Sequence, residues 1–357
     1  MKANDARRWG VALGFAAAVS AIIPPPSAAA PQTVAEIAGY TGPDRQAVLE
    51  AGARKEGELL VYTAAAVNKG LDDFARKYPF IQPRNFGADA PSVTRRVLEE
   101  YRAGRHVVDG YELNIGALRP IRDAGHLQAF LSPEFQSTRP EAIDPGRYWV
   151  HDYASYLSLG YNTKLISEKD VPSSYDDLLD PKWQGKMAIP GTSTLGNGVG
   201  VIVIEKGEDF VRKLGPQKIK VFEITGRAVA NFVVSGEVPL SPSIFSSHMA
   251  NSASQGAGVG WRALGGVYST IGAVALAAKA PHPHAAMLFL DYMLSKDAQV
   301  NMQKLGYVTA RTDLQNAERP GKVYDFSDRP NLAEDYEKWR TLGRDVFGKG
   351  EVPAGAK

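Results

Sequence analysis

The chain has 357 residues, of which 44% are hydrophobic, and 41 lysines and arginines nearly balance 39 aspartates and glutamates to a net charge of +2. This length and composition predict a globular protein of two domains. The balanced charge removes the electrostatic case for a nucleic-acid partner. The absence of cysteine excludes disulfides, a thiol nucleophile and a lipid-anchored cysteine.

The first 30 residues have the order of a secretory signal peptide. Basic residues precede an apolar run over residues 9–23, which is followed by prolines and small residues. The run is too short for a comfortable transmembrane helix, and no later stretch reaches about 18 apolar residues. We expect cleavage after Ala29, because Pro31 hinders a cut after Ala30, and a mature protein that is soluble in the periplasm.

Three strand-and-helix units follow in succession. The predicted strands are 59–63, 81–86 and 107–115, and the amphipathic helices after them lie over 71–78, 93–101 and 118–124. Such repetition predicts a parallel sheet with helices on its faces, and ligands bind beyond the carboxyl ends of its strands. Thr63, Ser92 and Asn114 lie at these ends and are therefore candidates for ligand binding.

A glycine- and hydroxyl-rich turn is expected over Gly191–Gly198, ahead of an apolar helix from Val199 onward. Such a turn leaves the first N–H groups of the helix unpaired at the positive end of its dipole. The hydroxyls beside them belong to Thr192, Ser193 and Thr194. The stretch predicts an anion site; the alternative is that one hydroxyl only caps the helix and the glycines only form the turn.

A second helix start follows the predicted strand 220–224. Gly226 and Arg227 open a helix that ends at Gly236, and there a guanidinium would reinforce the helix dipole on an anion. The alternative is an arginine that is merely solvated on a helix face, which applies equally to Arg95 and Arg96.

The next strand is expected over 238–240, with Ser243 beyond its carboxyl end as a further ligand candidate. Aromatic residues then suggest the walls of a cleft. Tyr268 is the candidate we name, and Tyr153, Tyr156 and Tyr161 have the same two interpretations, cleft wall or buried hinge.

The C-terminal part begins with a strand of small residues over 267–278 and two amphipathic helices, over 285–292 and 298–305. Beyond residue 311 the chain is polar. We expect one modest helix there, over 332–342.

No motif for catalysis or metal binding is complete. His282 and His284 lack a third ligand at zinc spacing, and Pro283 prevents a regular helical arrangement. The glycines over 196–200 lack the ending of a nucleotide-binding loop, and a nucleophile elbow is missing. We therefore expect no cofactor, no metal and no catalysis, with a secreted enzyme of unknown reaction kept as an alternative.

Four motifs punctuate the chain. They are Glu56–Thr63, Gly160–Leu165, Leu178–Lys186, and Ala280–Ala286 followed by Leu294–Asp297. In this order they resemble the ferric-iron-type periplasmic solute-binding proteins of ABC importers. The likeness runs from about Arg45 to Ala310, and its most specific element is the run from Asp180 to Lys186.

The resemblance implies an α/β fold of two lobes, each a sheet flanked by helices, with two crossing strands as a hinge near 154–162 and 265–272. It implies a signal peptide (1–29), lobe one (31–154 plus 268–315), lobe two (155–267) and a C-terminal extension that packs outside (316–357). The implied partners are a small solute in the inter-lobe cleft and the membrane permease of an ABC importer. We expect a monomer.

The ligand is predicted where the sequence departs from that family. Iron-binding members carry two adjacent tyrosines after the strand that follows the Ser-Gly-Glu turn, whereas Ser235–Glu237 leads here to Ser241–Phe245, and the chain has no adjacent tyrosine pair. Hydroxyls, helix N-termini and Arg227 suit an anionic organic solute, a phosphorylated one first and a carboxylate second. Ferric iron with a synergistic anion is the alternative.

Overall fold

The computed structural model describes residues 32–63, 68–315, 320–324, 326 and 331–353, so the predicted signal peptide lies outside the described residues. The strands are β1 (Glu58–Thr63), β2 (Gln82–Gly87), β3 (Gly110–Asn114), β4 (Leu127–Gln128), β5 (Trp149–Asn162), β6 (Ala188–Pro190), β7 (Lys220–Phe222), β8 (Leu240–Phe245), β9 (Val259–Arg262), β10 (Val267–Ala277) and β11 (Val323–Tyr324). The helices are α1 (Val34–Gly39), α2 (Arg45–Glu56), α3 (Asn68–Lys77), α4 (Ala90–Arg102), α5 (Ile115–Asp123), α6 (Ser193–Lys206), α7 (Glu208–Lys213), α8 (Gly226–Ser235), α9 (Ser246–Ser254), α10 (Pro283–Leu294), α11 (Lys296–Lys304) and α12 (Leu332–Phe347). Among the described residues, none of the helices is both long and apolar enough to cross a membrane.

The predicted parallel strand-and-helix units are confirmed. β1 pairs in parallel with β2 and with β3, and Thr63 stands opposite Gly87 on one side and Glu112 on the other. The order of the larger sheet is β2-β1-β3-β10-β5-β8, in which β10 runs antiparallel to both of its neighbours. The carboxyl ends of β1 and β3 therefore meet at one edge, beside β10.

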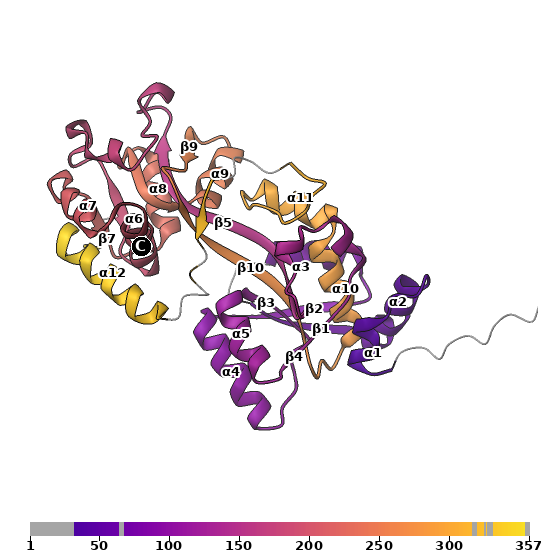
Figure 1. Ribbon diagram of the computed structural model, residues 1–357. Helices are drawn as coiled ribbons and strands as arrows, with labels where there is room; N and C mark the ends of the chain where they lie inside the picture. Colours follow the sequence, from indigo (N-terminus) through magenta and orange to yellow (C-terminus); the bar gives the residue numbers. More distant parts are fainter. Residues whose placement is uncertain (1–31, 64–67, 316–319, 325, 327–330, 354–357) are drawn as a thin grey trace, which may run out of the picture. The chain divides into compact units, whose positions relative to one another are not determined.

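The two long strands β5 and β10 run side by side in the larger sheet (Figure 1). Their register shifts once: Tyr153 pairs with Gly272 and His151 with Ala273, so Asp152 is an extra residue in β5. This is a β-bulge, a local irregularity that redirects side chains. Near its carboxyl end β5 leaves β10 and pairs with β8 and β9 instead.

The two largest clusters of buried apolar residues lie on different parts of these long strands. The first core surrounds β1 and β3 and includes Leu59, Val61 and Phe289 of α10. The second surrounds α6 and includes Leu159, Val199 and Trp339 of α12. Two cores joined by β5 and β10 give a two-lobed α/β fold, each lobe with sheet strands and flanking helices.

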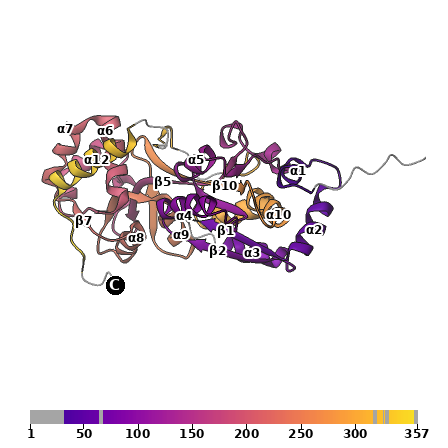
Figure 2. The same cartoon turned by 90° about the horizontal axis from the view of Figure 1, so that it is seen from below.

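The expected turn over Gly191–Gly198 is wrong beyond its first residues, because α6 already begins at Ser193. The glycines lie inside the helix and allow close packing of its neighbours. A Cβ on Gly196 would lie 2.5 Å from the Tyr336 ring, and one on Gly200 would lie 2.3 Å from the Trp339 ring. Figure 2 shows α12, which carries both rings, along α6 and α7. The residues after 331 thus complete the second core.

The predicted strand 238–240 is displaced: it begins at Leu240 and runs to Phe245, so Ser243 lies within β8. Pro242 and Ser243 together oppose Leu159, between the pairs Ser241 with Gly160 and Ile244 with Ser158. This bulge accommodates a proline, which has no N–H to donate to the ladder. α9 and β9, which follow, were not predicted.

Candidate functional site

The candidates of the first lobe lie at the predicted strand ends, but each has a local partner. The Thr63 hydroxyl is fully buried and donates to Glu112 Oε2 at 2.6 Å. Asn114 caps α5, since its Oδ1 accepts from the Ala117 N–H at 3.0 Å. The Ser92 N–H donates to Asp89, the cap of α4, at 3.0 Å. Thr63 and Asn114 thus flank Glu112 at the carboxyl edge of the sheet.

Glu112 and Asp152 form a buried carboxyl pair that the sequence interpretation missed. Both side chains are inaccessible to solvent. Among the described residues, Glu112 Oε1 and both carboxylate oxygens of Asp152 have no hydrogen-bond partner of good geometry. The available signal was a glutamate inside the predicted strand 107–115, between Tyr111 and Leu113.

Burial dominates the electrostatics of this pair. It raises the pKa of Glu112 to about 7, against smaller opposing effects of the Thr63 and Tyr153 hydroxyls. Burial and then the charge of Glu112 raise the pKa of Asp152 well above its usual range, although the amides of Asp152 and Tyr153 favour its charged form. A low-dielectric site disfavours two negative charges, so the pair is poised to take up a proton or a cation.

Two tyrosines adjoin the carboxyl pair. The rings of Tyr153 and Tyr307 lie 4.7 Å apart, with Tyr153 buried and Tyr307 half-buried. Burial raises the pKa of Tyr307, the negative charges of Glu112 and Asp152 raise it further, and Arg227 lowers it. The raised pKa keeps the Tyr307 hydroxyl protonated near neutral pH.

A cavity of about 430 Å³ brings Asn114 and Tyr268 together. Its other walls include Gly116 of α5, Asn197 of α6 and Tyr336 of α12. Asn197 stands one turn after the start of α6, so the cavity lies against the N-terminal part of that helix. Its size suits a small molecule.

The start of α6 has few local side-chain partners. Thr192 occupies the cap position without a capping hydrogen bond from its side chain. Its Oγ1 lies 3.4 Å from the Oγ1 of Thr194, which is buried. Ser193 opens the helix, and its side chain is outside the described set. The first N–H groups of α6 thus have no side-chain acceptor from the cap residue.

The start of α8 carries an exposed cation. Thr225 caps the helix by accepting from the Ala228 N–H at 3.2 Å, and Arg227 Nη1 donates to the His248 carbonyl at 3.2 Å. The His248 ring lies beside Gly226, where a Cβ would come within 3.4 Å of it. Burial, and then the Arg227 charge, lower the pKa of His248 to about 4. Arg227 and a neutral histidine thus stand together near neutral pH.

Ser243 lies away from these helix starts. It is buried, and its Oγ lies where a Cβ on Gly198 of α6 would be, 2.2 Å away. A small, largely apolar cavity there also contacts Leu195 and Val199. Ser243 thus faces the second core.

The other tyrosines and arginines considered have structural partners. Tyr161 donates to Glu168 at 3.1 Å, and Tyr156 packs with Val267 and Val308. Arg96 donates to Glu100 at 2.8 Å, whereas Arg95 is exposed.

His282 and His284 each contact a different carboxylate. His282 Nδ1 lies 3.0 Å from Asp109, and His284 Nδ1 lies 2.6 Å from Glu56. Both contacts secure the start of α10. Within the described residues, no three or more histidine, cysteine, aspartate or glutamate side chains gather as a metal site would require.

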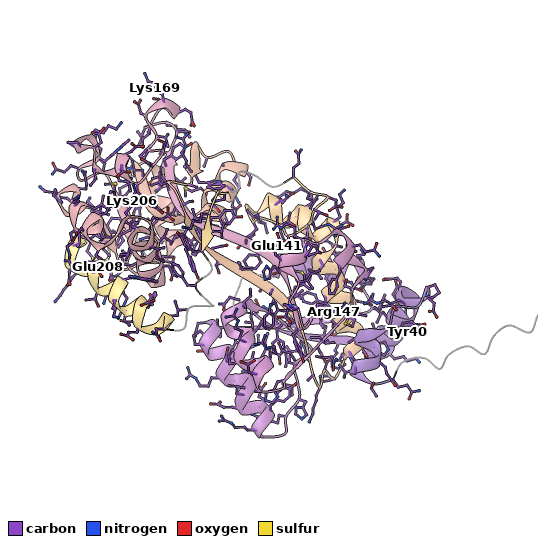
Figure 3. The ribbon with its side chains drawn as sticks, in the orientation of Figure 1. Tyr40, Glu141, Arg147, Lys169, Lys206 and Glu208 are labelled. Carbon is purple, nitrogen blue, oxygen red and sulfur yellow. The ribbon has the colours of Figure 1, made fainter. Side chains whose placement is uncertain are left out.

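Charged side chains of the second lobe also project at its surface. Lys169, Lys206 and Glu208 are exposed examples (Figure 3). Lys206 pairs with Asp176 at 2.5 Å. Lys169 and Lys206 lie outside α8, so neither belongs to the helix start that carries Arg227.

The comparisons agree with this fold. The sequence profile described as bacterial extracellular solute-binding protein matches residues 117–329. No curated protein matches the chain. The solved structure of iron-bound HitA from Pseudomonas aeruginosa superposes with a TM-score of 0.62 at 22% identity, over 81% of this chain and 99% of that one.

Two further structures are similar. AfuA from Actinobacillus pleuropneumoniae, with fructose-6-phosphate bound, gives a TM-score of 0.58 at 20% identity over 82% of this chain and 99% of that one. The substrate-binding protein of an ABC transporter from Agrobacterium tumefaciens gives 0.66 at 15% identity, over 80% and 94%. At these identities the likeness establishes the fold, and the predicted two-lobed α/β architecture is confirmed.

Proposed function

Because the chain belongs to the family of bacterial extracellular solute-binding proteins, we propose that it captures a small anionic organic solute and delivers it to the permease of an ABC importer. A phosphorylated solute is our first choice and a carboxylate our second. Membership of the family supports the general function, which is solute binding for import through an ABC transporter. The family is in general non-enzymatic, so the protein's task is to bind and release its solute unchanged.

The observation that carries the anionic ligand is the pair of helix starts at α6 and α8. α6 begins without a side-chain cap, and α8 carries the exposed Arg227 in its first turn. N–H groups at a helix start and a guanidinium are the donors that phosphate and carboxylate prefer. Asn114 and Tyr268, which share the cavity next to α6, would then contact the remainder of the solute.

Calorimetric titration of ligand-free protein tests this assignment. Sugar phosphates, other phosphate monoesters, phosphonates and organic acids are compared with ferric citrate and with uncharged sugars of matching size. We expect an anionic organic compound to bind and its uncharged counterpart to fail. Ferric binding that survives competing citrate, with the colour of a tyrosinate–iron complex, would restore the iron alternative. Turnover of the bound compound would instead establish an enzyme.

The contribution of α6 is tested separately. Changing Thr192 and Ser193 together to alanine should weaken anion binding, since each neutral hydrogen bond contributes about 0.5–1.5 kcal/mol. The matched control changes Thr163 and Ser167, exposed hydroxyl residues of the second lobe. Equal affinity in the two double variants would remove α6 from the site.

A further inference from the structure

We propose that the solute also carries a positively charged nitrogen, and that Glu112 and Asp152 form the subsite for it. The inference rests on the proposed function, because it adds a cationic group to the same anionic solute. The solute class becomes a small amino phosphate or amino acid rather than a simple acid.

The backbone brings the two carboxyls together. Glu112 comes from β3, and Asp152 is the extra residue of the bulge in β5. A bulge commonly re-aims a side chain next to a functional site. Val274 of β10 pairs with Glu112 on one side and with Val150, two residues before Asp152, on the other, so the bulge adds its carboxyl close to that of Glu112.

Three carboxylate oxygens of the pair lack a hydrogen-bond partner of good geometry among the described residues. Thr63 satisfies Glu112 Oε2, while Glu112 Oε1 and both oxygens of Asp152 lack a partner of good geometry. Both carboxyls are fully buried, and among the described residues neither forms an ion pair with a basic side chain. Burying unpaired carboxylates is unfavourable, and an ammonium group has three N–H donors to offer.

The strand pairing places this subsite beside the cavity that Asn114 and Tyr268 share. Gly272 of β10 pairs with Asn114 on one side and with Tyr153, the residue after Asp152, on the other. Glu112 lies two residues before Asn114 on β3, so its side chain is on the same face of the sheet. A solute that Asn114 contacts in the cavity therefore has the carboxyl pair next to it.

The test uses two series of compounds, and the members of each series differ at one group. Phosphoethanolamine, ethyl phosphate and 2-hydroxyethyl phosphate are titrated calorimetrically into purified protein at pH 7.5, and β-alanine and propionate form a second matched pair. In at least one series, the compound with the amine should bind at least about tenfold more tightly than the compounds without it. Glu112→Gln and Asp152→Asn should each abolish most of this preference. Ethyl phosphate or propionate should bind these variants at least as well as wild type.

Glu99→Gln is the control variant, because it makes the same chemical change on the exposed face of α4. Its preference for the amine should match wild type. Anion binding without an amine preference in either series would overturn the subsite and leave the proposed function standing. Failure of every anion to bind would overturn both. An affinity for ethyl phosphate that depends on added sodium would assign the pair to an inorganic cation and overturn the ammonium subsite. The wild-type comparison remains decisive if a variant fails to fold.

Discussion

Arg227 is exposed and hydrogen-bonded to the carbonyl of a neighbouring helix, so its guanidinium is positioned without being neutralised. Changing it to alanine should weaken binding of the anionic solute by roughly tenfold, because a charge-assisted hydrogen bond is stronger than a neutral one and solvent screens it here. Arg227→Lys should recover part of the loss at low salt. Titration calorimetry measures both variants, with Arg95→Ala, an exposed arginine of α4, as the control. An equal loss of affinity in Arg95→Ala would mean that the weakening arises from the net charge of the protein and not from a contact of Arg227.

The raised pKa of Glu112 predicts how stability depends on pH. Its folded pKa of about 7 lies above the ordinary 4.5, so the folded chain holds an extra proton between these values. The free energy of unfolding that this proton contributes is fully present below pH 4.5 and is lost as pH rises through 7, by about 3 kcal/mol in total. Glu112→Gln removes this loss. The groups that influence Glu112 here are Thr63, Asp152 and Tyr153.

Urea unfolding of ligand-free protein at pH 5 and pH 8 measures this effect. The stability of Glu112→Gln relative to wild type should increase from pH 5 to pH 8, whereas that of Glu99→Gln should not. A constant difference between Glu112→Gln and wild type would mean that Glu112 titrates normally in the folded chain.

The packing of helix α12 against helix α6 depends on the glycines of α6. A Cβ on Gly200 would meet the buried Trp339 ring at 2.3 Å. Overpacking costs about 1–3 kcal/mol and the better helix propensity of alanine returns up to about 1 kcal/mol, so Gly200→Ala should destabilise the protein. Gly39→Ala, in α1 where a Cβ meets no atom within 4 Å, should be neutral or slightly stabilising. Urea unfolding compares them, and equal stabilities would show that α12 adjusts freely.

At the scale of the molecule, the proposed function requires a hinge motion that closes both lobes on the solute. A ligand shifts such an equilibrium only through contacts that differ between the open and closed states. The radius of gyration from small-angle scattering should therefore fall when the solute identified by calorimetry saturates the protein. Arg227→Ala at the same solute concentration should show a smaller fall. An unchanged radius at saturation of wild type would count against closure.

The sequence by itself determined the strand-and-helix units, the parallel character of the sheet that they form, and membership of a solute-binding family. These properties rest on local periodicity and on motifs such as Asp180–Lys186, which can be read without knowing the fold. It also brought Thr63, Asn114 and Tyr268 into consideration through their places on predicted elements. Their contact with a solute stays a prediction.

Only the tertiary structure decided the start of α6, the course of β8 and the grouping of Glu112 with Asp152. In the sequence, the glycines of α6 are typical of a turn. Only the folded structure shows that the aromatic rings of α12 fill the space beside them. A bulge arises from the pairing of two strands more than 100 residues apart, which no local pattern reports. Likewise Tyr153 and Tyr307 become neighbours only when β5 and the segment after α11 fold together, because burial and side-chain proximity are properties of packing rather than of local sequence.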